Sequence, residues 1–302
     1  MLECGLIVAR FLHYAAGMAL FGVALFPLYA YPGRTEIQPS RFGDWLAPVL
    51  FKLALATFVS AIFWLAIVIA NMAGSFSAAI DPDAVKSVLF ETVFGQIWGL
   101  RILLAALLVV LTGVSVLRSN HHSLAAPIAV LSGALLATMA GAGHTMHSDG
   151  MQRVLHMISD GAHLLAAGAW FGGLLALGCV LMTASDDADL VLQRFSGMGY
   201  LAVATLVGSG LIKSWYMVGS LANLIATPYG QLLLFKLGIF GAMLCLAGAN
   251  RFRLVPALSN RSNDAAGPMA SLRRNVLAEQ SLGIVVILIV SLLGTLEPAI
   301  GH

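Results

Sequence analysis

The residues best suited to chemistry gather in one stretch of the chain, residues 143–173. His156, Asp160 and His163 stand at positions i, i+4 and i+7, so a helix would carry all three side chains on one face. Imidazole and carboxylate groups are ligands of transition metals, and polar groups inside an apolar stretch are costly unless they are used. This spacing favours a metal site on that face.

Two more histidines, His144 and His147, precede this face, and methionines are interleaved with all of them. Met146 lies between the first pair, and Met157 follows His156 directly. Imidazole together with thioether suits copper, and thioether favours Cu(I). The three cysteines are far apart in apolar runs, which argues against a cysteine-based zinc or iron–sulfur site. We therefore predict a copper site.

One ion cannot bind both ends of the helical face. His156 and His163 lie about 10 Å apart along a helix axis, because the rise is about 1.5 Å per residue. We expect an outer station at His144 and His147, together with deeper stations that include His156 or His163. Asp160 would be a ligand, a counter-charge or the acceptor that orients an imidazole.

A separate histidine, His13, lies in the first apolar stretch of the chain, with Arg10 and Gly17 on the same helical face. If this stretch enters the membrane from the same side as the later histidines, His13 reaches a depth similar to that of His156 and His163. We predict on this ground that separate helices build one site.

The elements that position these residues must be membrane helices. The chain has 302 residues, of which 59% are hydrophobic and 10% charged, whereas soluble domains have about 25% charged residues. A membrane-crossing helix needs about 20 apolar residues. The sequence predicts an all-α polytopic membrane protein, a single integral membrane domain over residues 1–302 formed by a bundle of eight transmembrane helices. These spans are residues 5–31, 46–73, 96–118, 124–143, 153–183, 192–218, 229–250 and 273–296.

The segment 82–95 is amphipathic and interrupted by Lys86 and Glu91, which predicts a short interfacial helix. Lys and Arg gather in the loops after the first, third, fifth and seventh spans, so those loops are expected in the cytoplasm. The chain is then a multi-pass protein of the bacterial inner membrane with both termini in the periplasm. A net charge of +2 without a basic stripe excludes nucleic acid as a partner.

Several segments along nearly the whole chain carry a family resemblance. They are HYAAG from His13, the GHTMHSDG loop, HLLAAGAWFGG from His163, TPYGQLLLFKL and RRNVLAEQSLGIVVI. With these segments the chain resembles the copper resistance protein D family of bacterial inner-membrane proteins. The resemblance implies eight transmembrane helices and a role in moving periplasmic copper inward or supporting a periplasmic resistance system. It also implies that His13, His144, His156 and His163 are candidate copper ligands.

We accordingly predict a copper-binding permease and not an enzyme. Copper, as Cu(I), would be caught at the outer histidines, passed to the deeper histidines with Asp160, and released into the cytoplasm. The chain has no phosphate-binding motif, so a gradient, a proton or an inner acceptor would drive this movement. Besides the lipid bilayer, the expected partner is a periplasmic copper-binding protein or chaperone.

Two alternatives remain open from the residues alone. A membrane b-type haem protein needs two histidines at one depth, and His13 with His156 or His163 would provide them. Nearby glycines would let a flat macrocycle approach the helices. A purely structural assembly subunit would need none of these histidines.

Overall fold

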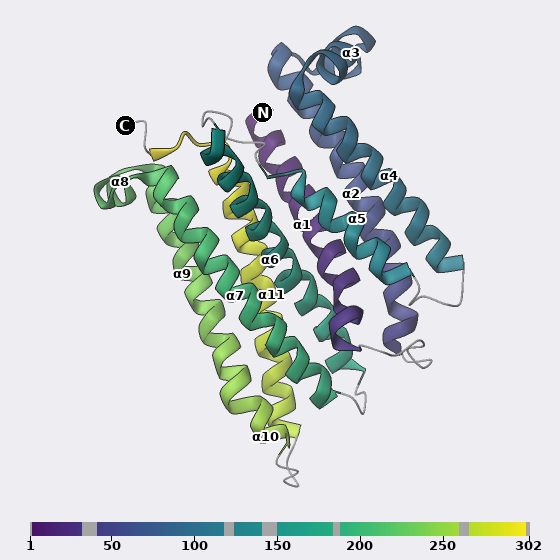
Figure 1. Cartoon of the computed structure of the whole chain (residues 1–302), viewed down its shortest axis with the longest axis vertical. Coiled ribbons are helices and arrows are strands. Elements are labelled where there is room, and N and C mark those ends of the chain that lie inside the picture. The colour runs from purple at the N-terminus through teal and green to yellow at the C-terminus, as the bar shows by residue number, and fades with distance from the viewer. Residues whose placement is uncertain are drawn as a thin grey trace.

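The computed structural model describes residues 2–31, 41–117, 124–140, 150–183, 188–259 and 266–299, and nearly all of these residues lie in helices (Figure 1). The predicted all-α fold class is confirmed. The long helices are α1 (Leu2–Ala30), α2 (Arg41–Ala73), α4 (Val93–Leu117), α6 (Gly150–Met182), α7 (Ala188–Val218), α9 (Pro228–Ala249) and α11 (Ala266–Leu293). The short ones are η1 (Phe76–Ile80), α3 (Pro82–Glu91), α5 (Ala125–Ala137), α8 (Leu221–Ala226), η4 (Asn250–Leu254) and α10 (Val255–Ser259).

Seven helices of the described chain are long and apolar enough to cross a membrane, against the eight that the sequence predicts. The exception is α5, whose 13 residues extend about 20 Å, less than the hydrocarbon thickness of about 30 Å. The helix ends where the carbonyl of Thr138 accepts a hydrogen bond from Nη2 of Arg101, at 2.8 Å. The buried side chain of Arg101 on α4 therefore binds the backbone at the point where α5 stops.

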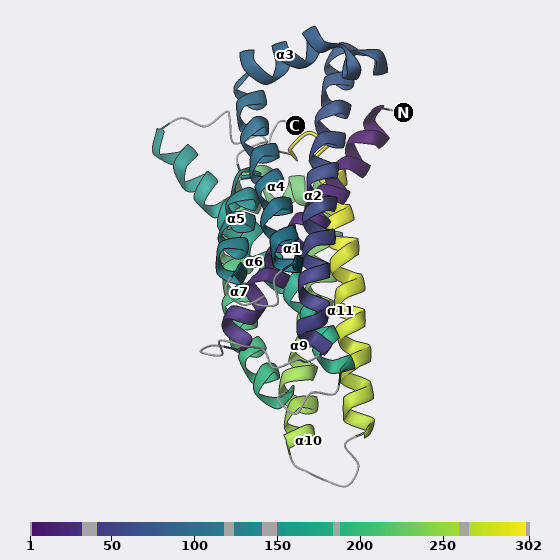
Figure 2. The same cartoon turned by 90° about the vertical axis from the view of Figure 1, so that its right-hand side faces the viewer.

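The segment predicted as an interfacial helix is a separate helix, but a shorter one. The structure ends α3 at Glu91 and begins α4 at Val93, with Thr92 in extended conformation between them. Asp81 caps the start of α3 by accepting a hydrogen bond from the backbone N–H of Asp83, and Pro82 follows in the first turn. Figure 2 shows α3 lying across the end of the α2–α4 pair.

The first helix is the centre of the bundle. It packs against α2, α5, α6 and α11, and α6 in turn packs against α7 (Figures 1 and 2). The start of α1 and the end of α11 lie at the same end of the molecule as α3, which we call the α3 end, and α10 marks the opposite α10 end (Figure 1). The predicted placement of both termini on one side agrees with this arrangement. Which side faces the periplasm stays a prediction.

The contact between α1 and α6 is made by glycines. A Cβ atom on Gly172 would lie 2.7 Å from the backbone oxygen of Ala19 and 2.7 Å from Cα of Gly22. A Cβ on Gly22 would in turn collide with the backbone of Gly168 and Gly172. Small residues let helix backbones approach closely in a membrane, where packing replaces the hydrophobic effect as the force between helices. This contact fixes the rotation of both helices about their axes.

We expect Gly172→Ala to destabilise the protein by about 1–3 kcal/mol, because the added methyl group meets backbone atoms that cannot rotate away. The matched control is Gly208→Ala on α7, where no atom lies within 4 Å of the new Cβ. That control should be neutral or slightly stabilising, because alanine favours helix over glycine. Thermal unfolding in detergent measures both, and equal midpoints for the two variants would contradict the close contact.

Candidate functional site

The predicted polar face of α6 exists and packs against α7. His156, Asp160 and His163 all lie in the half of the bundle nearer the α3 end, and each contacts a polar or aromatic residue of α7. From the α3 end inward, the partners are Tyr216 (ring centroids 3.9 Å from His156), Lys213 (Nζ 3.1 Å from Oδ1 of Asp160) and Ser209 (Oγ 2.9 Å from Nδ1 of His163). The expectation of one shared helical face is therefore confirmed, and we call this region the α6–α7 interface.

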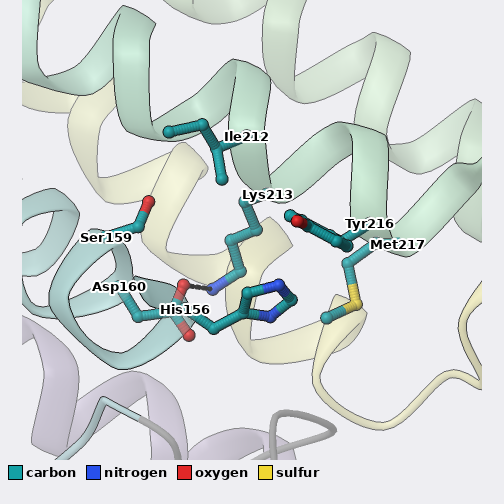
Figure 3. Close-up of a pocket in the computed structure, with 7 residues that line it drawn as sticks. All are labelled: His156, Ser159, Asp160, Ile212, Lys213, Tyr216 and Met217. Atoms are coloured by element: carbon teal, nitrogen blue, oxygen red, sulfur yellow. Dashed lines mark ion pairs between the residues drawn. The ribbon is translucent and has the colours of Figure 1, made fainter. Parts of the chain in front are cut away.

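A small pocket lies at the outer part of this interface (Figure 3). Its cavity volume is about 10 Å³, enough for one water-sized guest. Figure 3 shows the imidazole of His156 between the Lys213–Asp160 ion pair and the thioether of Met217. Its lining residues are His156, Ser159, Asp160, Ile212, Lys213, Tyr216 and Met217.

The pocket leaves one strong ligand atom unused. Nε2 of His156 is buried and has no hydrogen-bond partner among the described residues. Met217 faces this imidazole (Figure 3) and could not be predicted from the sequence, because methionine is a routine filler of apolar helices and no spacing rule links it to α6. Met157, the predicted thioether, instead has a 43% exposed side chain and does not line the pocket.

Deeper in the same interface, a serine fixes the orientation of His163. The hydroxyl of Ser209 donates to the backbone oxygen of Thr205, so its oxygen accepts a hydrogen bond from Nδ1–H of His163. The imidazole is thereby held as the tautomer whose Nε2 carries a lone pair. Fixing a tautomer through the second nitrogen is how proteins prepare an imidazole to bind a metal.

The same arrangement holds His13 on the other side of the bundle. The hydroxyl of Ser60 on α2 donates to the backbone oxygen of Thr57 at 3.0 Å, and its oxygen lies 3.0 Å from Nδ1 of His13. His13 is fully buried, and its Nε2 has no hydrogen-bond partner in the described part of the chain. The ring of Trp64 packs edge-on against this imidazole, with centroids 5.6 Å apart.

His13 and His163 stand at the same level but point in opposite directions. Met18 contacts the Gly168 position, and both lie five residues further along their helices than the two histidines. Five residues turn a helix by about 140°, so the imidazoles face away from the α1–α6 contact, one toward α2 and the other toward α7. The expected depth match is correct, whereas the expected joining of these histidines into one site is not found among the described residues.

The surroundings of His13 are positively charged. The guanidinium carbon of Arg10 lies 5.8 Å from the ring centroid of Trp64, and that of Arg101 lies 5.9 Å from the same ring. A copper ion at His13 would meet two guanidinium groups, while the α6–α7 interface offers the carboxylate of Asp160. The interface also carries two cations, Lys213 and Lys236, so its advantage for a metal cation is the carboxylate of Asp160 and not an overall negative charge.

Three of the predicted ligands, His144, Met146 and His147, lie outside the described residues, so the outer station stays a prediction. Within the described residues, no group of three or more His, Cys, Asp and Glu side chains is placed to hold a metal ion together. Copper binding at the α6–α7 interface would therefore use sites with two ligands, one of them a sulfur atom. Such sites suit Cu(I).

The buried carboxyl of Glu279 belongs to a different network, which joins η4 to α11. Its Oε1 accepts a hydrogen bond of 2.7 Å from the side-chain amide of Asn250. The amide of Asn275 donates to Oδ1 of Asn250 at 2.8 Å. These bonds satisfy a polar cluster inside the bundle and pair the helices that carry it.

Comparison with known proteins points to copper. The model of the copper resistance protein D-like N-terminal domain matches residues 1–155, and that of copper resistance protein D matches residues 189–293. The chain is 30% identical to the inner membrane protein YebZ of Escherichia coli (strain K12), over 97% of this chain and 98% of that protein. It is 30% identical to copper resistance protein D of Pseudomonas syringae pv. tomato, over 97% and 96% of the two chains.

A longer relative is the copper transport protein CutJ of Bacillus subtilis (strain 168). It is 30% identical over 99% of this chain, which spans 54% of that protein. No solved structure matches the chain.

The ion pair of the pocket can be measured by a double-mutant cycle with Asp160→Asn, Lys213→Met and the double variant. We expect a coupling free energy of about 1 kcal/mol, because the ammonium group is 43% exposed and its attraction is partly screened. Unfolding of the purified protein in detergent gives the three differences. Additive effects of the two substitutions would mean that the pair does not hold α6 against α7.

Proposed function

Because the chain belongs to the copper resistance protein D family, we propose that it is an inner-membrane copper-binding protein that takes up copper from the periplasm along the α6–α7 interface. It is a multi-pass membrane protein of a copper-handling family. Copper is the cargo in this proposal, and the protein acts as a permease without a catalytic residue.

The observation that carries the proposal is the unpartnered, buried Nε2 of His156 beside the thioether of Met217. A neutral imidazole and a thioether form a two-ligand set of soft character, and such ligands select Cu(I) over Zn²⁺ and Mg²⁺. The small cavity excludes a hydrated ion, so only copper that has lost its water fits. Together these features support His156 and Met217 as the first described station.

We place a second station about two helical turns deeper, at His163. His163 is seven residues beyond His156, about 10 Å along the axis, and its hydrogen bond to Ser209 through Nδ1 puts the lone pair on Nε2. Asp160 lies between the two imidazoles and attracts a cation that moves from one to the other. Lys213 opposes that movement while its ammonium group rests on Asp160. Its long side chain, 43% exposed, is free to swing away and open the path.

The direction of movement is inward in this proposal. The predicted outer histidines, His144 and His147, would receive copper from a periplasmic copper-binding protein, and the α6–α7 interface would pass it on. A gradient or a proton would drive the movement, as the sequence holds no phosphate-binding motif.

The test replaces the two ligands of the first station. We expect His156→Ala and Met217→Leu each to weaken Cu(I) binding to the purified protein at least tenfold, because each removes one of two ligands. Competition against a chromophoric Cu(I) chelator measures the affinity. Cellular copper accumulation should fall in the same two variants.

Met157→Leu is the matched control, because it removes an exposed thioether next to His156 that does not line the pocket. It should bind copper as the unchanged protein does. Equal affinity in all three variants and the unchanged protein would rule out the α6–α7 interface as the copper site. A loss confined to Met157→Leu would place the ligand on the outer surface of α6 instead.

A further inference from the structure

A group of positive charges inside the bundle has no carboxylate paired with it among the described residues. Arg101 is fully buried, with Nε and Nη2 donating to Thr138 and with Nη1 lacking a partner in the described part of the chain. Arg10 has two buried nitrogens, Nε and Nη1, and neither has a hydrogen-bond partner among those same residues. Both guanidinium groups lie close to the ring of Trp64. The ion pair found among the described residues is Lys213–Asp160, on the far side of the α1–α6 contact.

Unpaired charges within a membrane are costly, and such side chains usually pair with an opposite charge or face water. Stacking on tryptophan compensates only part of that cost. Arg101 already donates two hydrogen bonds to Thr138. Arg10 is therefore the residue with more unused donors, its Nε and Nη1. An oxyanion at Arg10 would satisfy these donors and neutralise one of the two charges.

An apolar groove begins at Phe11, the residue that follows Arg10 on α1, and Arg10 itself is not among its lining residues. It lies between α1, α2 and α11, has a cavity volume of about 590 Å³, and is lined from Phe11 and Phe63 down to Ala19 and Leu53. Its lining is almost wholly apolar, and Ala56 and Ile284 form part of its wall. We call it the α1–α11 groove. Its size falls in the range of pockets that hold small-molecule ligands.

The position of Arg10 above the groove matches the layout of a phospholipid, whose charged headgroup lies above its apolar acyl chains. Side chains of a helix point toward its N-terminus, so Arg10 extends toward the α3 end, away from Phe11 and the groove. Its Nη1 lies beside Gly294, one residue past the end of α11, where the span leaves the apolar part of the bundle. A charged group thus lies at the mouth of an apolar groove that runs toward the middle of the membrane.

We propose that Arg10 binds the phosphate of an anionic phospholipid whose acyl chain lies in the α1–α11 groove. The positive charge of Arg101 strengthens the attraction from inside the bundle. An anionic phospholipid is the occupant that matches both halves of this surface, the positive charge of Arg10 at the mouth and the apolar wall below it. The site is separate from the α6–α7 interface and holds whether or not that interface binds copper.

The experiment uses the full chain, purified in mild detergent and examined by native mass spectrometry after addition of phosphatidylglycerol. The unchanged protein should retain one phosphatidylglycerol molecule. Arg10→Gln should lower the retained fraction at least tenfold through the loss of the phosphate contact. Ala56→Phe should do the same by filling the groove, since Ala56 is exposed there and the larger side chain needs no repacking of the core.

Arg274→Gln is the matched control, because it removes an exposed arginine of α11 toward the α10 end. It should retain phosphatidylglycerol as the unchanged protein does. A thermal-shift series separates the possible occupants: phosphatidylglycerol should raise the unfolding midpoint of the unchanged protein, and neither phosphatidylcholine nor inorganic phosphate should match it. The Arg10→Gln variant should lose that shift.

Three results would overturn the proposal. Equal stabilisation by inorganic phosphate would make this a site for a free anion. Equal stabilisation by phosphatidylcholine would make it a general lipid surface without charge recognition. Equal loss of phosphatidylglycerol in Arg274→Gln and Arg10→Gln would show that the retained lipid surrounds the protein at no fixed site.

Discussion

The close contact of α1 with α6 is the constraint on which the rest of the bundle depends. Gly22 and Gly172 bring the two backbones together so tightly that neither position has room for a Cβ atom. Because the contact fixes how each helix is rotated, the faces that carry His13 and His163 turn away from one another. The two histidines therefore lie in separate polar regions of the bundle, one between α1 and α2 and one between α6 and α7.

The two regions orient a histidine in the same way, but the charged groups around the histidine differ. In each region a serine hydroxyl donates a hydrogen bond to a backbone oxygen of its own helix. Its oxygen accepts a hydrogen bond from Nδ1–H of a histidine, which puts the lone pair of the imidazole on Nε2. Around His13 the neighbouring charges are the guanidinium groups of Arg10 and Arg101, which attract anions. Around His163 and His156 the carboxylate of Asp160 lies among two ammonium groups, those of Lys213 and Lys236. The presence of a carboxylate among the neighbouring charges, and not the histidine itself, separates the two regions chemically.

Much of the candidate site could be predicted from spacing. The i, i+4, i+7 pattern correctly put His156, Asp160 and His163 on one face, because helical periodicity is local. Ser209 and Met217 could not be found in this way, since serine and methionine are ordinary in apolar helices and lie on another helix. The expected joining of His13 with the deeper histidines is not found among the described residues for a related reason: equal depth does not tell which way a side chain points.

The sequence by itself determined the membrane class, the position of seven spans and the shared face of α6, because these depend on local composition and on the helical repeat. Only the tertiary structure decided which helix each face meets, where α5 ends and which charges surround each histidine. In a soluble helix the apolar stripe indicates the buried side. In a membrane helix most faces are apolar, so rotation is set by contacts between helices such as that of Gly22 with Gly172.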